Sequence, residues 1–138
     1  MTQLQSYTTI EQSKKLAEIL PIESADMEYL LEHWIDEKTG RHKEGYCEIP
    51  VVKVDDDYPL QPITLPCWSL AALLDILPDE ITDDGDVYRN MFFHLKGKYI
   101  IQYPRLTTLW PSLLSVEAYN PVDACYEMII KLNAQNLI

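Results

Sequence analysis

Two apolar segments joined by Lys96-Gly97 constrain the fold more than any other feature of the sequence. Two residues suffice to reverse an antiparallel chain, and glycine readily adopts the positive φ that such a turn needs. The sequence therefore predicts a β-hairpin over residues 87–103. Its register pairs Leu95 with Lys98, Phe93 with Ile100 and Met91 with Gln102. Both faces of this hairpin are partly apolar, so we expect helices to cover one face and a loop or a second copy of the chain to cover the other.

A second hairpin is predicted over residues 28–54. The segment 36–45 is polar and contains two glycines, which is typical of a hairpin tip, and residues 46–54 follow it with three valines. Periodicity does not decide whether the first nine residues, 28–36, form a strand or a helix. Residues 55–66 hold three prolines and are expected to form a long surface loop, because proline cannot donate to a sheet.

Three helices are predicted, over residues 9–20, 68–77 and 121–134. The first has Thr8 as N-cap with Glu11 three residues later, and Pro21 follows its end. The third begins at Asn120-Pro121, with asparagine as N-cap and proline at the first helical position.

The middle helix, 68–77, is apolar on almost every side, which is typical of a helix buried in a core or docked on a partner. The chain shows no strict alternation of strand and helix, so a doubly wound parallel sheet is not expected. The pattern favours an α+β fold in which an antiparallel sheet packs against about three helices. At 138 residues the chain is expected to form a single domain, 1–138.

The charge of the chain is strongly acidic and unevenly distributed. Twenty-two acidic and 11 basic residues give a net charge of −11, and residues 21–66 alone carry −7. Direct binding to nucleic acid or to a membrane surface requires clustered Lys and Arg, so neither is expected. No secretory signal is apparent, and the three cysteines are an odd number without a C-x-x-C pair. Reduced thiols and a cytoplasmic location are therefore expected.

Residues 104–119 are expected to be irregular but apolar, and they contain the best predicted contacts with a partner. The predicted interaction residues in this stretch are Leu106, Leu109, Trp110 and Leu113. A tryptophan outside regular structure is a common interface anchor. The alternative is that this stretch folds back as a lid over the hairpin at 87–103.

Candidate chemistry is weak in this sequence. His33 and His42 could ligate a metal together with a carboxylate or Cys47, although their spacing matches no common zinc pattern. Cys67 at a helix start could act as a nucleophile with His94 as its base, but a buried structural cysteine is the more usual occurrence. The segment 83–86 (DDGD) matches a tight turn better than a calcium loop. The sequence contains no nucleotide-binding or hydrolase motif and indicates no cofactor.

Three stretches together carry a resemblance that covers most of the chain. They are Glu11-Gln12-Ser13-Lys14-Lys15-Leu16 with Ser24-Ala25-Asp26-Met27, Pro66-Cys67-Trp68-Ser69-Leu70-Ala71-Ala72-Leu73-Leu74, and Asn120-Pro121-Val122-Asp123-Ala124-Cys125 through Leu132. In these stretches the chain resembles a group of short uncharacterised proteins that prophages and other mobile elements of anaerobic gut bacteria carry. The resemblance implies a phage or mobile-element origin, and it implies no activity and no functional residue.

The sequence thus favours a non-enzymatic accessory protein that acts through contacts with a protein partner or with itself. One alternative is an acidic inhibitor or nucleic-acid mimic that binds a basic protein through Asp55, Asp56 and Asp57. Another is a small enzyme built around Cys67 or the pair His33 and His42.

Overall fold

The computed structural model describes residues 5–53, 64–108 and 112–138, and it confirms the α+β prediction. In chain order the elements are α1 (Ile10–Ala17), the 3-10 turn η1 (Ile22–Ser24), β1 (Met27–Ile35), β2 (His42–Tyr46), β3 (Val51–Val52), β4 (Thr64–Cys67), α2 (Leu70–Ile76), β5 (Glu80–Asp83), β6 (Asp86–Arg89), β7 (Met91–Leu95), β8 (Lys98–Pro104), β9 (Ser112–Ala118) and α3 (Pro121–Ala134). All strand pairs are antiparallel.

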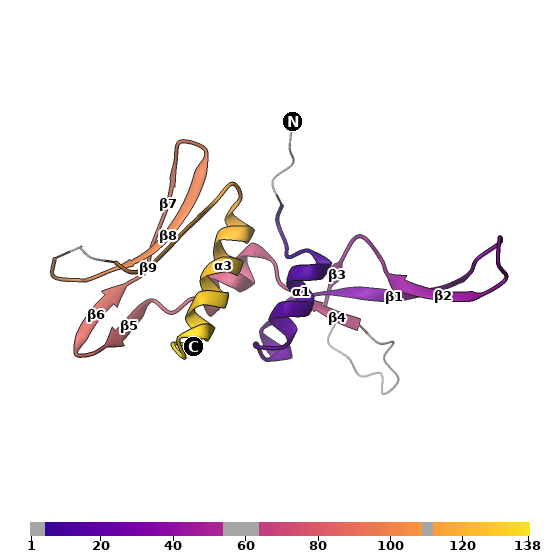
Figure 1. Ribbon diagram of the computed structural model, residues 1–138, viewed down its shortest axis with the longest axis horizontal. Helices are drawn as coiled ribbons and strands as arrows, with labels where there is room; N and C mark the ends of the chain where they lie inside the picture. The colour runs from indigo at the N-terminus through magenta and orange to yellow at the C-terminus, as the bar shows by residue number, and fades with distance from the viewer. Residues whose placement is uncertain (1–4, 54–63, 109–111) are drawn as a thin grey trace.

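The helices α2 and α3 occupy the centre of an elongated molecule (Figure 1). The three-stranded sheet β7-β8-β9 and the hairpin β5-β6 lie on one side of α3, whereas α1 and the strands β1 to β4 lie on the other. The hairpin of β1 and β2 projects away from the rest of the chain, and we call its paired part, residues 31–46, the arm.

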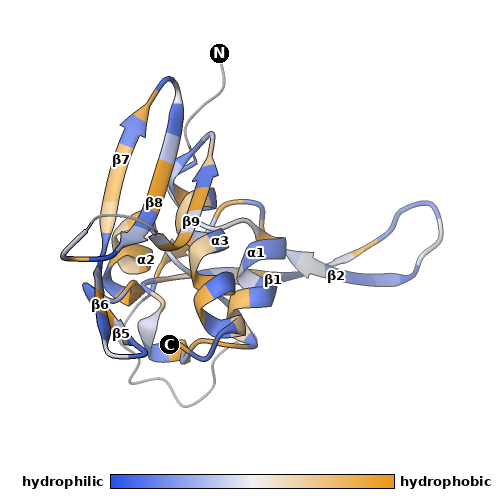
Figure 2. Ribbon diagram, turned by 60° about the vertical axis from the view of Figure 1, so that its left-hand side comes forward, coloured by the Kyte–Doolittle hydropathy of each residue, from blue (hydrophilic) through white to orange (hydrophobic). Residues whose placement is uncertain are grey.

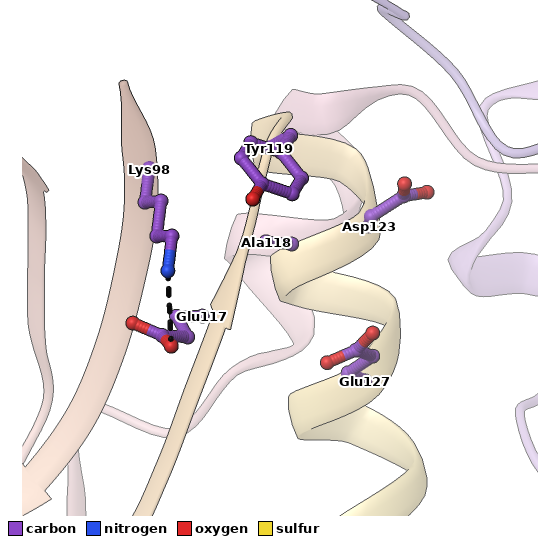
Figure 3. A pocket seen from close by; sticks show the side chains of 6 residues that line it. All are labelled: Lys98, Glu117, Ala118, Tyr119, Asp123 and Glu127. Atoms are coloured by element: carbon purple, nitrogen blue, oxygen red, sulfur yellow. Dashed lines mark hydrogen bonds and ion pairs between the residues drawn. The ribbon is translucent and has the colours of Figure 1, made fainter. Parts of the chain in front are cut away.

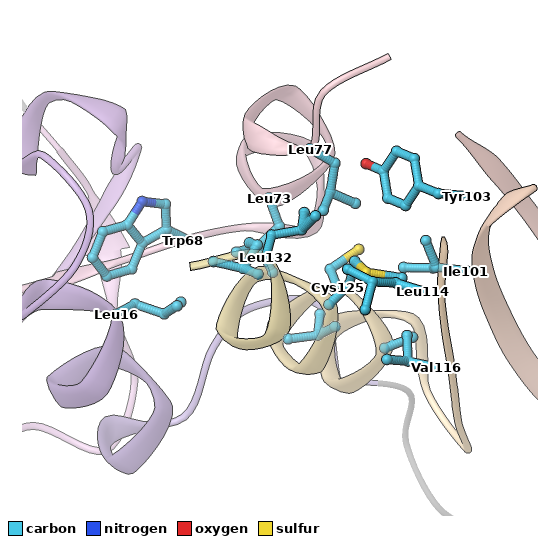
Figure 4. Packing of buried hydrophobic residues seen from close by; sticks show 14 of the residues in the cluster. Leu16, Trp68, Leu73, Leu77, Ile101, Tyr103, Leu114, Val116, Cys125 and Leu132 are labelled. Carbon is cyan, nitrogen blue, oxygen red and sulfur yellow. The ribbon is translucent and has the colours of Figure 1, made fainter. Parts of the chain in front are cut away.

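One hydrophobic cluster joins the elements on the two sides (Figure 4). Its fully buried members include Leu16 of α1, Trp68 just before the N-cap of α2, Leu73 of α2, Ile101 of β8 and Leu132 of α3. Leu132 lies between the tryptophan side and the sheet side of this cluster, so α3 serves as the central layer. A smaller cluster around Tyr29, Leu65 and Cys67 fills the base of the β1–β4 sheet.

Helix starts follow from local side-chain chemistry, with one correction. Asn120 caps α3 by accepting a hydrogen bond of 2.8 Å from the amide of Asp123, as predicted. The N-cap of α1 is Thr9 with Gln12 as its capping-box partner, so the prediction of Thr8 with Glu11 was wrong by one residue. Thr8 is instead buried, and its hydroxyl bonds to core groups.

The hairpin predicted over residues 28–54 is present, with a shorter tip than expected. The return strand begins at His42 rather than at Tyr46, and it continues after an interruption as β3. Strand β1 pairs on its other side with β4 through residues 27–30. The first residues of β1 are therefore paired on both sides, with β3 and with β4. In the arm, the described partner of β1 is β2 on one side. Residues 64–66, expected to be loop, belong to β4, where Pro66 lies opposite Glu28.

The register predicted for residues 91–102 of the second hairpin is confirmed, with Leu95 opposite Lys98 and Phe93 opposite Ile100. Lys96 and Gly97 have φ values of 53° and 78°, and a two-residue hairpin turn of this type requires a positive φ at both central residues. The first part of the predicted hairpin was wrong, because the residues before Asn90 form the separate strand β6 (86–89), which pairs with β5. The polar turn predicted at 83–86 connects β5 to β6.

Residues 112–118 form the strand β9 on the far side of β8, which corrects the expectation that 104–119 is irregular. Leu114 and Val116 face the core from this strand, and Ser115 between them is exposed. A register shift between Gln102 and Pro104 ends the regular pairing of β8 with β9.

Candidate interaction surface

The predicted interaction residues fall in different environments. Leu106 is 44% exposed just after β8, and Leu113 is half-buried in β9 and packs against the main core. Leu109, Trp110, Asp55, Asp56 and Asp57 lie outside the described residues.

Cys67 is fully buried, which works against a role as nucleophile. Its sulfur lies 3.5 Å from the carbonyl oxygen of Thr8 and 3.6 Å from the hydroxyl of the same residue. Burial raises the pKa of the Cys67 thiol. Its proposed base, His94, belongs to β7 on the opposite side of α3 from β4, so the two side chains do not meet (Figure 1).

The other two thiols also have raised pKa values. Burial raises the pKa of Cys125 to about 12, and this side chain is enclosed by the core. Cys47 is half-buried at the base of the arm, where the neighbouring carboxylate of Glu32 raises its pKa. A carboxylate beside a thiol disfavours the thiolate, because the two charges have the same sign.

We expect Cys47 to react first with a thiol reagent such as DTNB, and Cys67 and Cys125 to react only when the protein unfolds. Glu32→Gln is expected to speed the reaction of Cys47, because removing the carboxylate lowers the thiol pKa and increases the thiolate fraction. Absorbance-monitored kinetics at constant pH provide the measurement, with Glu48→Gln as the control. A fast phase that persists in Cys47→Ser would contradict this assignment.

The two histidines of the predicted metal cluster lie on the exposed arm. Their rings stack with centroids 5.3 Å apart, and His33 Nδ1 lies 3.5 Å from a carboxylate oxygen of Glu44. Among the residues that the structure describes, no three His, Cys, Asp or Glu side chains gather closely enough to hold a metal ion.

A shallow hollow of about 310 Å³ lies between β8, β9 and the first turns of α3 (Figure 3). It is lined by Lys98, Glu117, Ala118, Tyr119, Asp123 and Glu127. The ammonium of Lys98 lies 3.5 Å from Glu117 and 5.8 Å from the centre of the Tyr119 ring. Three carboxylates against one lysine make the hollow unsuitable for phosphate, although a helix begins beside it. No nucleophile and base are paired there.

A group of exposed apolar side chains lies on β7. Met91 is 42% exposed, Phe92 38% and Leu95 54%, although all three belong to one five-residue strand. The strand extends with β8 beyond α3, and the body of its ribbon is hydrophobic whereas its arrowhead is hydrophilic (Figure 2). Side chains from both faces of β7 therefore reach solvent.

The arrangement of the sheet explains this exposure. Phe92 shares a face with Ile101 and Val116, the two core residues opposite it in register, but α3 packs on β8 and β9 rather than on β7. The other face carries Met91, Phe93 and Leu95. His94 stacks on Tyr99 at 4.3 Å between ring centroids, which stiffens the hairpin near its turn.

The backbone of β7 offers a free edge. Within the described residues, β8 is the strand that pairs with it, and β7 ends the sheet. In a hairpin with a two-residue turn the pair that flanks the turn is hydrogen-bonded, and such pairs alternate with non-hydrogen-bonded ones. Leu95, Phe93 and Met91 therefore bond to β8, whereas the N–H and C=O groups of Phe92 and His94 point away from it.

The sequence carries a signal for this surface in the two partly apolar faces expected for the hairpin at 87–103. The segment MFFHL has no charged residue, and it lacks the apolar–polar alternation of a strand with one solvated face. Whether such a segment lies at the centre or at the edge of a sheet depends on its neighbours, which the sequence alone did not identify.

Comparison of the chain with protein-family models, with curated proteins and with solved structures finds no significant match. No described helix is both long enough and apolar enough to cross a lipid bilayer. The proposals below consequently rest on the physical features of the chain.

Proposed function

We propose that this protein is a non-enzymatic binding module that acts through protein–protein contacts, and that β7 is its contact surface. The observation that carries the proposal is the combination of an unpaired strand edge with exposed apolar side chains on both faces of that strand. An extended segment of a partner would add to the sheet beside β7.

Strand addition uses two kinds of contact, and β7 offers both. The outward N–H and C=O groups of Phe92 and His94 would bind the backbone of the added strand. Met91, Phe92 and Leu95 would contact its side chains on the two faces, and burying them removes apolar surface from water.

Edge strands in soluble proteins are normally protected from such pairing. Common protections are a lysine or proline within the strand, a bulge, or a covering element. Strand β7 contains neither lysine nor proline, and its pairing with β8 runs without the register shift that a bulge would cause. An edge left open in this way favours a binding role.

The test is capture from a lysate of the source cells on the immobilised protein, with washes at low salt and at 1 M salt. We expect a stoichiometric partner that survives high salt, because apolar contacts and backbone hydrogen bonds are not screened as exposed charges are, over a Debye length of ~3 Å at 1 M. Met91→Lys is expected to abolish the capture, since it places a charge in the apolar contact.

Ile138→Lys is the matched control, because its side chain is 45% exposed, similar to that of Met91, and lies at the C-terminus away from β7. Equal capture by the wild type and by both variants would show that β7 is not the contact surface. A partner removed by salt from all three proteins would instead support the acidic alternative.

A further inference from the structure

We propose that the strand added beside β7 is β7 of a second copy of this chain. The two strands would be antiparallel, and the two-fold axis that relates them would pass between their two Phe93 residues. This inference rests on the proposed function of β7 and names its occupant. The two three-stranded sheets would then join into one continuous sheet.

The register follows from the outward backbone groups. Since Phe92 and His94 point their N–H and C=O groups away from β8, a second antiparallel β7 can bond to both of them when Phe92 lies opposite His94 of the second copy. Two-fold symmetry repeats this bonded pair on the other side of Phe93. The same register places the two Phe93 residues opposite each other as a non-hydrogen-bonded pair.

The side chains match themselves in this register. On one face Met91 of each copy lies opposite Leu95 of the other, which gives two Met–Leu pairs. The two Phe93 rings lie between these pairs. On the other face Phe92 lies opposite His94, which gives two aromatic pairs. Aromatic and aliphatic pairs across strands are stabilising, so the contact is self-complementary along all five residues of β7.

The charge distribution of the chain allows two copies to pair at β7, because this strand itself is uncharged. The protein carries a net charge of −11, so most of its surface repels another copy of itself. Strand β7 carries no Asp, Glu, Lys or Arg, and Lys96 just beyond it would lie opposite the uncharged Asn90. The pair thus forms where like charges do not face each other.

Covalent trapping tests the register directly. Cα atoms of a non-hydrogen-bonded antiparallel pair are about 4.5 Å apart, which is within the range of a disulfide. Phe93→Cys in a Cys47→Ser background should therefore form an intermolecular disulfide under mild oxidation. Met91→Cys in the same background is the control, because its two copies would be offset by four residues, or roughly 14 Å.

We expect at least about tenfold more covalent dimer from Phe93→Cys than from Met91→Cys, because only the first pair lies within disulfide range. Sedimentation of the wild type over a concentration series provides a second measurement that needs no substitution. Five residues a side make a small interface, so we expect a monomer–dimer equilibrium that moves to dimer as concentration rises.

A wild type that stays monomeric over the whole series, or equal trapping of both cysteine variants, would overturn the second-copy proposal. If the protein is monomeric while Met91→Lys still abolishes capture of another protein, the proposed function stands and only its occupant is wrong. If the wild type dimerises but Phe93→Cys is not trapped, the dimer uses another surface and the register proposed here is wrong.

Discussion

Replacing Trp68 with alanine is expected to lower the free energy of unfolding by about 3–5 kcal/mol, the usual range for a fully buried large aromatic side chain. Trp68 is completely buried where α1 meets α2, beside Leu16 (Figure 4). Its indole N–H also donates a hydrogen bond of 2.9 Å to the hydroxyl of Ser24. The substitution therefore leaves a cavity and removes a hydrogen bond. Urea unfolding followed by circular dichroism measures the change.

Trp34→Ala is the matched control for this prediction. Trp34 undergoes the same chemical change but is 47% exposed on the arm, where it covers Gly45. We expect it to cost less than about 1 kcal/mol, because surface substitutions have small effects. Similar losses of stability in the two variants would show that Trp68 is not the core residue described here.

Thr8→Val is expected to lower the free energy of unfolding by about 2–3 kcal/mol, although the two side chains have nearly the same shape. The hydroxyl of Thr8 accepts a hydrogen bond of 3.1 Å from the amide of Trp68 and lies 2.8 Å from the hydroxyl of Ser13. Valine leaves these buried groups without that partner, and a buried unsatisfied donor costs about 1–3 kcal/mol.

The exposed Thr107 provides the control, since Thr107→Val should change stability by less than about 0.5 kcal/mol. The double variant Thr8→Val, Ser13→Ala tests the mechanism. Because it removes both hydroxyls of one bond, it should cost less than the sum of the two single changes. Strict additivity would mean that the two hydroxyls do not interact.

Local chemistry explains the parts of the fold that the sequence predicted accurately. Lys96-Gly97 permits only a tight turn between two β-favouring segments, and the turn then determines the register of the pairs from Met91 to Lys98. Asn120-Pro121 similarly fixes the first residue of α3 through one side-chain hydrogen bond and one restricted φ. Each of these features is determined by residues close together in the chain.

The features that the sequence did not predict depend on distant partners. Thr8 and Thr9 both fit an N-cap, and what distinguishes them is that Trp68, sixty residues away, bonds to Thr8. Leu114 and Val116 of β9 alternate with polar residues, but the neighbouring Leu113 obscured the alternation. The same reason applies to the surface of β7, because its exposure results from where α3 ends relative to the hairpin.

The arm also provides a practical handle for immobilising the protein. Its tip, residues 36–41, lies at the far end of the molecule from β7 (Figure 1). A Cβ at Gly40 would meet no atom within 4 Å. A peptide tag inserted at this tip lengthens a loop that is already solvent-exposed, and each doubling of such a loop costs only about 0.6 kcal/mol. A protein anchored there presents its free strand edge outward, so the support does not obstruct what binds to it.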